Sequence, residues 1–168
     1  MPVTQYKVIR DTREKEDHGW LWGKSKYCQG MVKQKLDQGD YAIEGYEDFM
    51  IIERKGSVSE WATNLGKEWG RFERELERSR HIKHMWIVLE FTMKDVMNFP
   101  VGSGIPRRSW SGLPFKGPFL LKRTLEIMQT YPNVKILFAG GSGKEVASSI
   151  FKRTTEMIDA GKFKRSDS

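Results

Sequence analysis

The chain has 168 residues, with 29 Lys and Arg against 22 Asp and Glu, a net charge of +7. The length fits one domain, and a hydrophobic share of 38% without a long apolar run excludes a disordered chain, a fibrous repeat and a membrane-spanning helix. The N-terminus lacks the apolar core of a signal peptide, and the single cysteine, Cys28, excludes an internal disulfide and a Cys-cluster zinc site. We therefore expect one domain over residues 1–160 and a basic tail over 161–168, in the cytoplasm or otherwise inside a cell, with no membrane contact.

The positive charge is unevenly distributed. Residues 1–99 carry 17 basic and 17 acidic side chains, whereas residues 100–168 carry 12 basic and 5 acidic ones, so the whole excess lies in the second part. A neutral part rich in carboxylates beside a cationic part suits a protein that holds metal ions and a polyanion. A basic solvated surface with a basic tail explains the same charges.

The first part of the chain predicts strands with one ambiguous segment. Alternating apolar residues and turn chemistry predict strands at Gln5–Arg10, Asp40–Glu44 and Asp48–Lys55, with a turn over Gly45–Asp48 between the last two. Cys28–Leu36 is compatible with a short helix that ends before Gly39.

A single long helix is the clearest prediction. An apolar stripe at helical spacing runs from Val58 to Leu76, and Ser57 with Glu60 forms an S-x-x-E capping box at its start. The opposite face carries mixed charges that predict solvent contact. Met85–Phe91 is a short apolar run typical of a buried strand.

The second part alternates strand and helix. Asn98–Pro118 predicts a loop of about 20 residues, long enough to have a function in a compact domain. Further elements are predicted at Phe119–Tyr131 (helix, with Leu121, Leu125 and Met128 inward), Val134–Ala139 (strand) and Ser142–Ile158 (helix). This alternation implies a parallel sheet with flanking helices.

Two carboxylates and a lysine converge if the two central strands form a hairpin. Glu53 and Lys55 point to the same face of their strand, and a four-residue loop over Gly45–Asp48 sets Asp40 opposite Glu53. Two carboxylates that close repel each other unless a cation sits between them, and Mg²⁺ or Mn²⁺ is the natural occupant because it takes oxygen ligands. Lys55 would then hold the attacking water or the developing negative charge. An exposed hairpin with ordinary charge pairs is the alternative.

Three ordered motifs resemble the signature of the XPF-type structure-specific endonucleases, which include the archaeal Hef nuclease. They are V-I-R-D-T-R-E at Val8–Glu14, Gly39-Asp40-Tyr41, and I-E-R-K at Ile52–Lys55. The similarity continues through residues 65–90 and 121–151 and covers about residues 6–158. The resemblance implies an α/β fold of the PD-(D/E)xK, restriction-endonuclease-like class, with a central mixed sheet flanked by helices.

The resemblance also implies the chemistry. It predicts a metal-dependent DNA endonuclease that hydrolyses phosphodiesters at branched or flap structures and leaves a 5′-phosphate and a 3′-hydroxyl. Asp40 and Glu53 would be metal ligands, with Asp11 as a further one, and Lys55 would be the catalytic lysine. Asp11 and Glu14 would line the site as outer acids, and Arg13 and Arg54 would position phosphate or neighbouring carboxylates.

The chain departs from the family pattern in three ways. The family has a further aspartate where this chain has Ser59, and Glu60 either replaces it with a one-residue slip or serves only the capping box. The Asn98–Pro118 loop is longer than expected at this place. The helix–hairpin–helix motifs that usually follow the nuclease domain are not in this sequence, which suggests a bacterial or phage-infected cell; the partner protein is unknown, and a homodimer through the nuclease domain is the arrangement considered.

The long loop supplies candidate DNA contacts. Arg107, Arg108 and Lys116 would contact phosphates, while Trp110 either stacks on an exposed base or packs the loop down. Gly140–Lys144 lacks the first glycine and the Ser/Thr of a phosphate-binding P-loop, so it does not predict nucleotide binding. The helix start at Lys144 can still receive a DNA phosphate.

Three functions remain open. They are the metal-dependent endonuclease, a catalytically inactive DNA-binding or scaffold subunit of a nuclease complex, and a junction-resolving or restriction-like nuclease of the same fold. The presence of Asp40, Glu53 and Lys55 together favours an enzyme, because an inactive subunit has no chemical need for all three.

Overall fold

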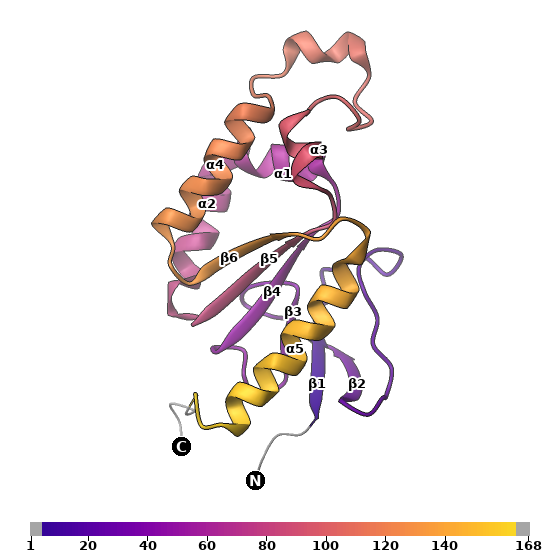
Figure 1. Ribbon diagram of the computed structural model, residues 1–168, viewed down its shortest axis with the longest axis vertical. Coiled ribbons are helices and arrows are strands. Elements are labelled where there is room, and N and C mark those ends of the chain that lie inside the picture. Colours follow the sequence, from indigo (N-terminus) through magenta and orange to yellow (C-terminus); the bar gives the residue numbers. More distant parts are fainter. Residues whose placement is uncertain (1–4, 164–168) are drawn as a thin grey trace.

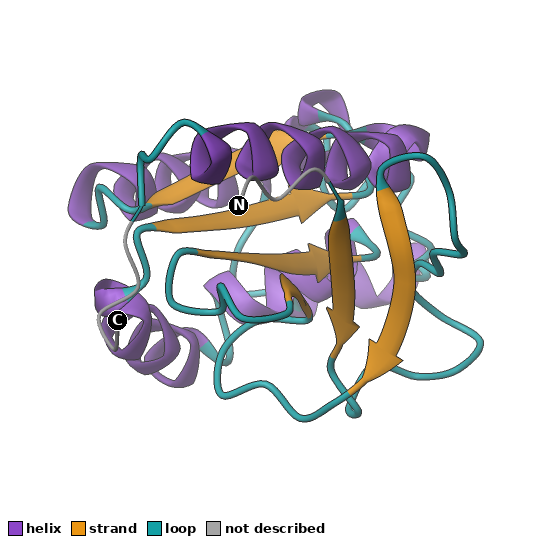
Figure 2. Cartoon of the chain, turned by 90° about the horizontal axis from the view of Figure 1, so that it is seen from below, coloured by secondary structure: helices purple, strands orange, loops and turns teal. Residues whose placement is uncertain are grey.

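The computed structural model describes residues 5–163, which form a six-stranded sheet between two layers of helices (Figures 1 and 2). The predicted mixed α/β architecture is confirmed. The strands lie in the order β2-β1-β3-β4-β5-β6. Their bounds are β1 Tyr6–Arg10, β2 Cys28–Lys33, β3 Tyr41–Ile43, β4 Met50–Lys55, β5 His84–Leu89 and β6 Val134–Phe138.

The sheet combines two kinds of pairing. The pairs β1–β2, β4–β5 and β5–β6 are parallel, while β3 runs antiparallel to both β1 and β4. Figure 2 shows the strong twist of the sheet, in which β1 and β2 run across the direction of the β4–β6 strands. The parallel arrangement predicted for the second part of the chain is therefore confirmed.

Helices cover both faces. One face packs against α1 Val58–Leu65, α2 Trp69–Arg78 and α4 Gly117–Thr130, and the other packs against α5 Gly143–Asp159. The short α3, Met93–Met97, follows β5. Each face has its own apolar cluster, one around Trp61 and Leu65 and the other around Tyr41 and Phe151. No helix in the described part of the chain is long and apolar enough to cross a membrane.

Three local predictions are wrong. The segment after Cys28 is the strand β2 rather than a helix, because it finds a parallel partner in β1. The long helix is divided at Gly66, which caps α1 and lies so close to the Phe115 ring that a Cβ there would be 2.5 Å from Cδ2. In α4 the prediction fails for Leu125, which is 49% exposed, whereas Leu121 and Met128 are partly buried against the core and the fully buried face consists of Leu120, Thr124 and Ile127.

The long loop is partly helical and projects from the body. Residues 98–116 leave the end of α3, form a short 3₁₀ helix at Arg107–Gly112 and return to α4, and Figure 1 shows this segment at one end of the molecule. The amide of Gly117 donates to the carbonyl of Phe99 (3.1 Å) and closes its base. The predicted tail, residues 161–168, lies mostly outside the described residues.

The close approach of α4 to α3 at Gly117 predicts a stability effect. A Cβ at this position would meet the carbonyl oxygen of Met97, a backbone atom that cannot rotate away. We expect Gly117→Ala to lower the free energy of unfolding by about 1–3 kcal/mol, as overpacking does. Urea unfolding measures the change. The control is Gly112→Ala, which has open space at its Cβ and should shift stability by less than about 0.5 kcal/mol; equal effects of the two changes would contradict the steric explanation.

Candidate active site

The alternation of β4 brings Glu53 and Lys55 to the face covered by α1 and α2. Ile51, two residues earlier, belongs to the apolar cluster of that face. Lys55 Nζ lies 3.5 Å from Glu53 Oε1, and the Lys55 side chain is only 8% exposed. An acid and an ammonium group therefore share one nearly buried patch beside α2.

Asp40, the residue immediately before β3, lies beside Glu53 and Lys55. The pairs Tyr41↔Ile52 and Ala42↔Ile51 follow the register predicted from the four-residue loop. The regular pairing ends at Tyr41, since the Asp40 amide donates to the Ile52 carbonyl (2.8 Å) rather than facing Glu53 in the ladder. The Asp40 carboxylate is fixed by the Arg54 amide, which donates to Oδ2 at 2.8 Å. The two carboxylates thus lie side by side.

The carboxylate pair has an unfavourable excess of negative charge. Burial raises the pKa of Asp40 well above its usual value, and the nearby charges of Glu53 and Glu14 raise it further. Burial alone would lower the pKa of the Lys55 ammonium, but the carboxylates of Glu53, Glu60 and Asp40 outweigh burial, and the pKa is raised. Lys55 therefore stays charged, and it neutralises only part of the carboxylate charge.

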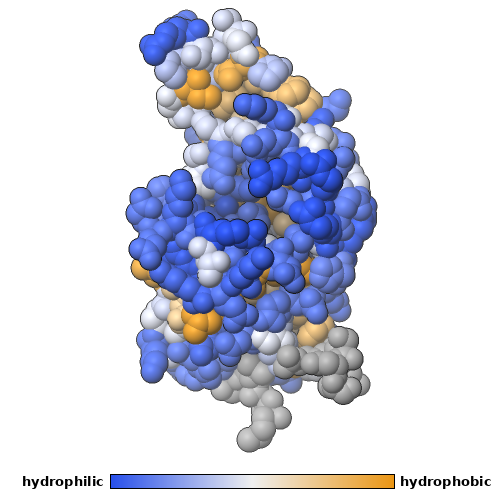
Figure 3. All heavy atoms as spheres, turned by 180° about the vertical axis from the view of Figure 1, so that it is seen from behind, coloured by the Kyte–Doolittle hydropathy of each residue, from blue (hydrophilic) through white to orange (hydrophobic). Residues whose placement is uncertain are grey.

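A polar cavity of about 210 Å³ opens beside the pair. Asp11, Asp37, Asp40 and Glu53 supply carboxylates to its lining, and Glu75 and Arg78 of α2 line it as well. Figure 3 shows the hydrophilic surface of the molecule from behind, with a hollow below the projecting end. The polar cavity gives a phosphate or a hydrated ion access to the carboxylates of Asp40 and Glu53.

The residues of the cavity fit a hard divalent cation. Among residues 5–163 no group of three or more His, Cys, Asp or Glu side chains is arranged around one metal position. Mg²⁺, however, keeps several waters and is commonly held by one or two carboxylates together with substrate phosphate. The paired oxygens of Asp40 and Glu53, with the raised pKa of Asp40, are the donor set that such an ion stabilises.

Asp11 and Arg13 line the cavity but are engaged with each other. Asp11 Oδ2 accepts a hydrogen bond from Arg13 Nε (2.7 Å), and Oδ1 accepts one from the Leu36 amide (3.2 Å). Arg13 also donates to the Leu36 carbonyl. Asp11 can therefore bind a metal only by exchanging one of these bonds, and its predicted role as a ligand stays a prediction.

Arg54 points to the opposite face of β4, away from the cavity. Its Nη1 donates to Glu90 Oε1 at 3.0 Å, its Nε lies 3.4 Å from Glu14 Oε2, and its guanidinium lies 6.0 Å from the Trp20 ring. Of the two roles expected for Arg54, the structure places it against carboxylates rather than in a position to meet phosphate. Glu14 likewise lies on this side and does not line the cavity.

Three glycines make room for the cluster that Arg54 forms with Glu14, Glu90 and Trp20 on this face. A Cβ at Gly56 would lie 2.6 Å from Arg54 Nη1, and one at Gly143 would lie 2.7 Å from Trp20 and 3.0 Å from Glu90. A Cβ at Gly19 would meet Tyr41 and Glu14. The glycine-rich run before Lys144 therefore packs the start of α5 against Trp20 and Glu90, where the negative Glu90 also suits the helix dipole.

Glu60 forms half of the predicted capping box. Its amide donates to Ser57 Oγ (3.1 Å), but its Oε2 accepts from the Gly56 amide (3.0 Å) rather than from the amide of Ser57. Its Oε1 lies 3.9 Å from Lys55 Nζ. Ser59, at the position of the family's aspartate, donates from Oγ to the Ser103 carbonyl (3.1 Å) and ties the projecting segment to α1.

The predicted DNA contacts come from separate elements. Arg107 and Arg108 are exposed in the 3₁₀ helix, and Lys116 is exposed at the start of α4. Trp110 is half-buried, and its indole N–H donates to the Ile105 carbonyl (2.9 Å), so it holds the segment together. Lys144 lies at the start of α5, with Nζ 5.9 Å from the Trp22 ring.

Sequence reasoning assigned no role in the site to Glu75, Arg78 and Glu90. Glu75 and Arg78 belong to the charged helix face that predicted solvent contact, but both line the cavity. Glu90 directly follows the buried strand β5, which pairs in parallel with β4. An acid at the carboxyl end of a buried strand was the signal in the sequence that could have indicated a role for Glu90.

Comparisons with known proteins show the fold. No family model matches the chain, and no curated protein does. Two solved structures of XPF from Aeropyrum pernix match it, at 19% identity and a TM-score of 0.56, and, in a complex with DNA, at 20% identity and a TM-score of 0.59. They cover 89% and 92% of this chain, which corresponds to 61% and 66% of theirs. The chain thus shares the fold of these XPF structures, as its motifs predicted, and spans less than two thirds of them.

The raised pKa of Asp40 predicts a gain of stability when its charge is removed. Folding favours the protonated form, so the metal-free protein loses stability as pH rises from about the ordinary value of 3.8 through the raised pKa. A tenfold difference in proton affinity between the folded and unfolded states corresponds to about 1.4 kcal/mol, so the effect is measurable. Asp40→Asn keeps the acceptor for the Arg54 amide and removes the charge, so it should unfold at higher temperature than the wild type at neutral pH in chelator.

Thermal unfolding between pH 4 and pH 8 checks this expectation. Asp17→Asn, at a side chain that is 82% exposed, is the matched control and should follow the wild-type profile. An Asp40→Asn protein no more stable than the wild type at pH 8 would contradict the electrostatic explanation.

Proposed function

We propose that the protein is a divalent-metal-dependent DNA endonuclease. The observation that carries the proposal is the pairing of Asp40 and Glu53 with Lys55 Nζ 3.5 Å from Glu53, at the edge of an open polar cavity. The XPF nuclease fold supports the class of reaction, and the structure of XPF bound to DNA supports DNA as the polymer. Mg²⁺ or Mn²⁺ is the proposed cofactor.

The proposed chemistry divides the work between two carboxylates and one ammonium group. Asp40 and Glu53 would hold the ion, which when bound lowers the pKa of water and polarises the phosphoryl oxygens. Lys55 remains protonated beside them and would hold the attacking water and stabilise the negative charge that develops on the phosphoryl oxygens. Arg54 keeps the backbone of β4 fixed, and its amide orients Asp40.

The proposed substrate is branched or flap DNA, as arises in repair and recombination. Arg107, Arg108 and Lys116 form a cationic segment with no acidic residue between Asn98 and Pro118, and Ser59 links that segment to the helix that follows Lys55. Phosphate contacts there would orient a duplex toward the cavity.

Substitution of the three central residues tests the proposal. We expect Asp40→Asn, Glu53→Gln and Lys55→Met each to lower the rate of cleavage of labelled flap and fork DNA by about 100-fold or more, because each removes a group that acts in the transition state. The wild type should cut with Mg²⁺ or Mn²⁺ and not in chelator. The matched control is Lys33→Met, at an exposed strand lysine, which should cut at the wild-type rate.

Undiminished cleavage in chelator or by Asp40→Asn would remove the metal mechanism. A wild type that binds the same DNA and cuts no flap, fork, junction or duplex with either metal would instead favour the inactive scaffold subunit.

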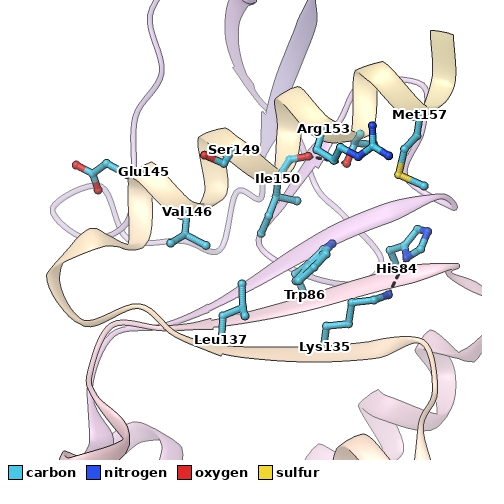
Figure 4. Close-up of a pocket in the computed structure, with 11 residues that line it drawn as sticks. His84, Trp86, Lys135, Leu137, Glu145, Val146, Ser149, Ile150, Arg153 and Met157 are labelled. Atoms are coloured by element: carbon cyan, nitrogen blue, oxygen red, sulfur yellow. Dashed lines mark hydrogen bonds between the residues drawn. The ribbon is translucent and has the colours of Figure 1, made fainter. Parts of the chain in front are cut away.

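A second proposed property is a homodimer, based on an apolar groove on the other face of the sheet. The groove of about 460 Å³ lies between α5 and the ends of β5 and β6 (Figure 4). Trp86, Leu137, Val146 and Ile150 form its apolar wall, and Leu137 is 37% exposed. In the described residues β6 pairs only with β5, so this edge of the sheet is open.

Charges along α5 make the groove self-complementary. Glu145, Ser149 and Arg153 follow one another at intervals of four residues along its rim, about 6 Å apart in a helix. A two-fold axis near Ser149 would set Glu145 of each copy against Arg153 of the other, as an isologous interface requires. We therefore propose a second copy of this chain as the occupant of the groove.

A charge exchange tests the dimer. Glu145→Arg and Arg153→Glu should each shift the wild-type dimer toward monomer in sedimentation equilibrium, because each puts like charges in contact. The double variant should restore the dimer. A monomeric wild type, or a dimer that is insensitive to either single change, would contradict this interface.

A further inference from the structure

A second cavity lies at the projecting end of the molecule, outside the acidic site. It has a volume of about 330 Å³ and lies between α1 and the segment 98–116. This size is at the lower end of that of ligand pockets, about 300–1,000 Å³. Figure 3 shows apolar side chains gathered at this end of the molecule.

The walls of the cavity are aromatic and aliphatic. Phe99, Phe115, Ile105 and Leu113 line it, and no acidic residue does among those described. The Phe115 ring is stacked on Phe119, with ring centroids 4.2 Å apart, so its orientation is fixed before anything binds. A planar apolar ring is the shape that such a wall accepts best.

The cavity is preformed because its segment is tied down at several points. Ser59 Oγ donates to the Ser103 carbonyl, and the Trp110 indole donates to the Ile105 carbonyl. The absence of a side chain at Gly66 lets Phe115 approach α1. Little ordering is then required on binding, which favours affinity.

One cation lines the cavity. Lys67 contributes to its wall, and no carboxylate among the described residues does. A ligand with an apolar ring and an attached anion satisfies both the apolar walls and this lysine. Nucleotides of a DNA strand combine these two properties.

The cavity is joined to the acidic site through the first turn of α1. Ser59 lines the cavity, and its neighbour Glu60 lies 3.9 Å from Lys55. The first turn of α1 therefore borders both the cavity and the acidic site, so a DNA strand that occupies both would pass along this turn. A base that is paired and stacked in a duplex is not free to enter.

We propose that this cavity binds one unpaired nucleobase of the DNA strand that the acidic site cleaves. The inference rests on the proposed nuclease function and adds to it a contact that would distinguish the proposed flap substrate from plain duplex, since flaps, forks and single-stranded ends offer an unpaired base and plain duplex does not. Phe115 supplies the stacking face, and Lys67 holds an adjoining phosphate.

Binding of single-stranded oligonucleotides in chelator tests the proposal without cleavage. Two fluorescent oligonucleotides with the same charge and backbone are compared by anisotropy, one with all its bases and one with a central abasic run. Because base–aromatic stacking contributes about 1–3 kcal/mol, the wild type should prefer the base-bearing strand by about 5- to 150-fold.

Two variants locate the effect. Phe115→Leu removes the stacking ring, and Ala62→Leu fills the cavity from α1; both should abolish the preference and leave affinity for the abasic strand and its salt dependence unchanged. Tyr27→Leu, at an aromatic residue 37% exposed elsewhere, is the matched control and should keep the preference.

Equal binding of both strands by the wild type would overturn the proposal, as would a preference that survives both cavity variants. Failure of the nuclease function is distinguishable, because a protein that never cleaves can still show the preference. A protein that cleaves DNA without the preference refutes only the base site.

Discussion

The arrangement depends on one hydrogen bond between neighbouring strands, from the Arg54 amide to the Asp40 carboxylate at 2.8 Å. This hydrogen bond fixes Asp40, the residue immediately before β3, beside Glu53 of β4, although the regular pairing of the two strands reaches only to Tyr41. Two carboxylates this close are unfavourable in the metal-free protein, as the raised pKa of Asp40 indicates. The fold therefore maintains a charge arrangement that a divalent cation would relieve.

The opposite face of β4 explains how that charge repulsion is tolerated. Glu53 and Lys55 point to the cavity, whereas Arg54 between them points into a pocket formed by Glu14 and Glu90. Close-packed glycines enclose this pocket and leave the guanidinium little freedom. The backbone of Arg54 is held in the sheet, and its side chain is held by Glu14 and Glu90. The amide that orients Asp40 is therefore fixed without help from exposed side chains.

Sequence reasoning reached the parts that short-range geometry controls. The loop over Gly45–Asp48 set the β3–β4 register, and strand alternation put Glu53 and Lys55 on one face. It failed for β2, because the pairing with β1 brings together segments distant in sequence, and for the division of the long helix at Gly66, which depends on Phe115. The partners of Arg54 and the contribution of α2 to the cavity likewise required the packed structure.

Direct measurement of metal binding tests the central claim that Asp40 and Glu53 form a cation site. Titration of the metal-free protein with Mn²⁺, followed by electron paramagnetic resonance of the free ion, counts bound ions without any DNA. We expect one site in the wild type that is lost in both Asp40→Asn and Glu53→Gln and kept in Asp17→Asn. Unchanged Mn²⁺ binding by the first two variants, or none by the wild type at millimolar Mn²⁺, would contradict it.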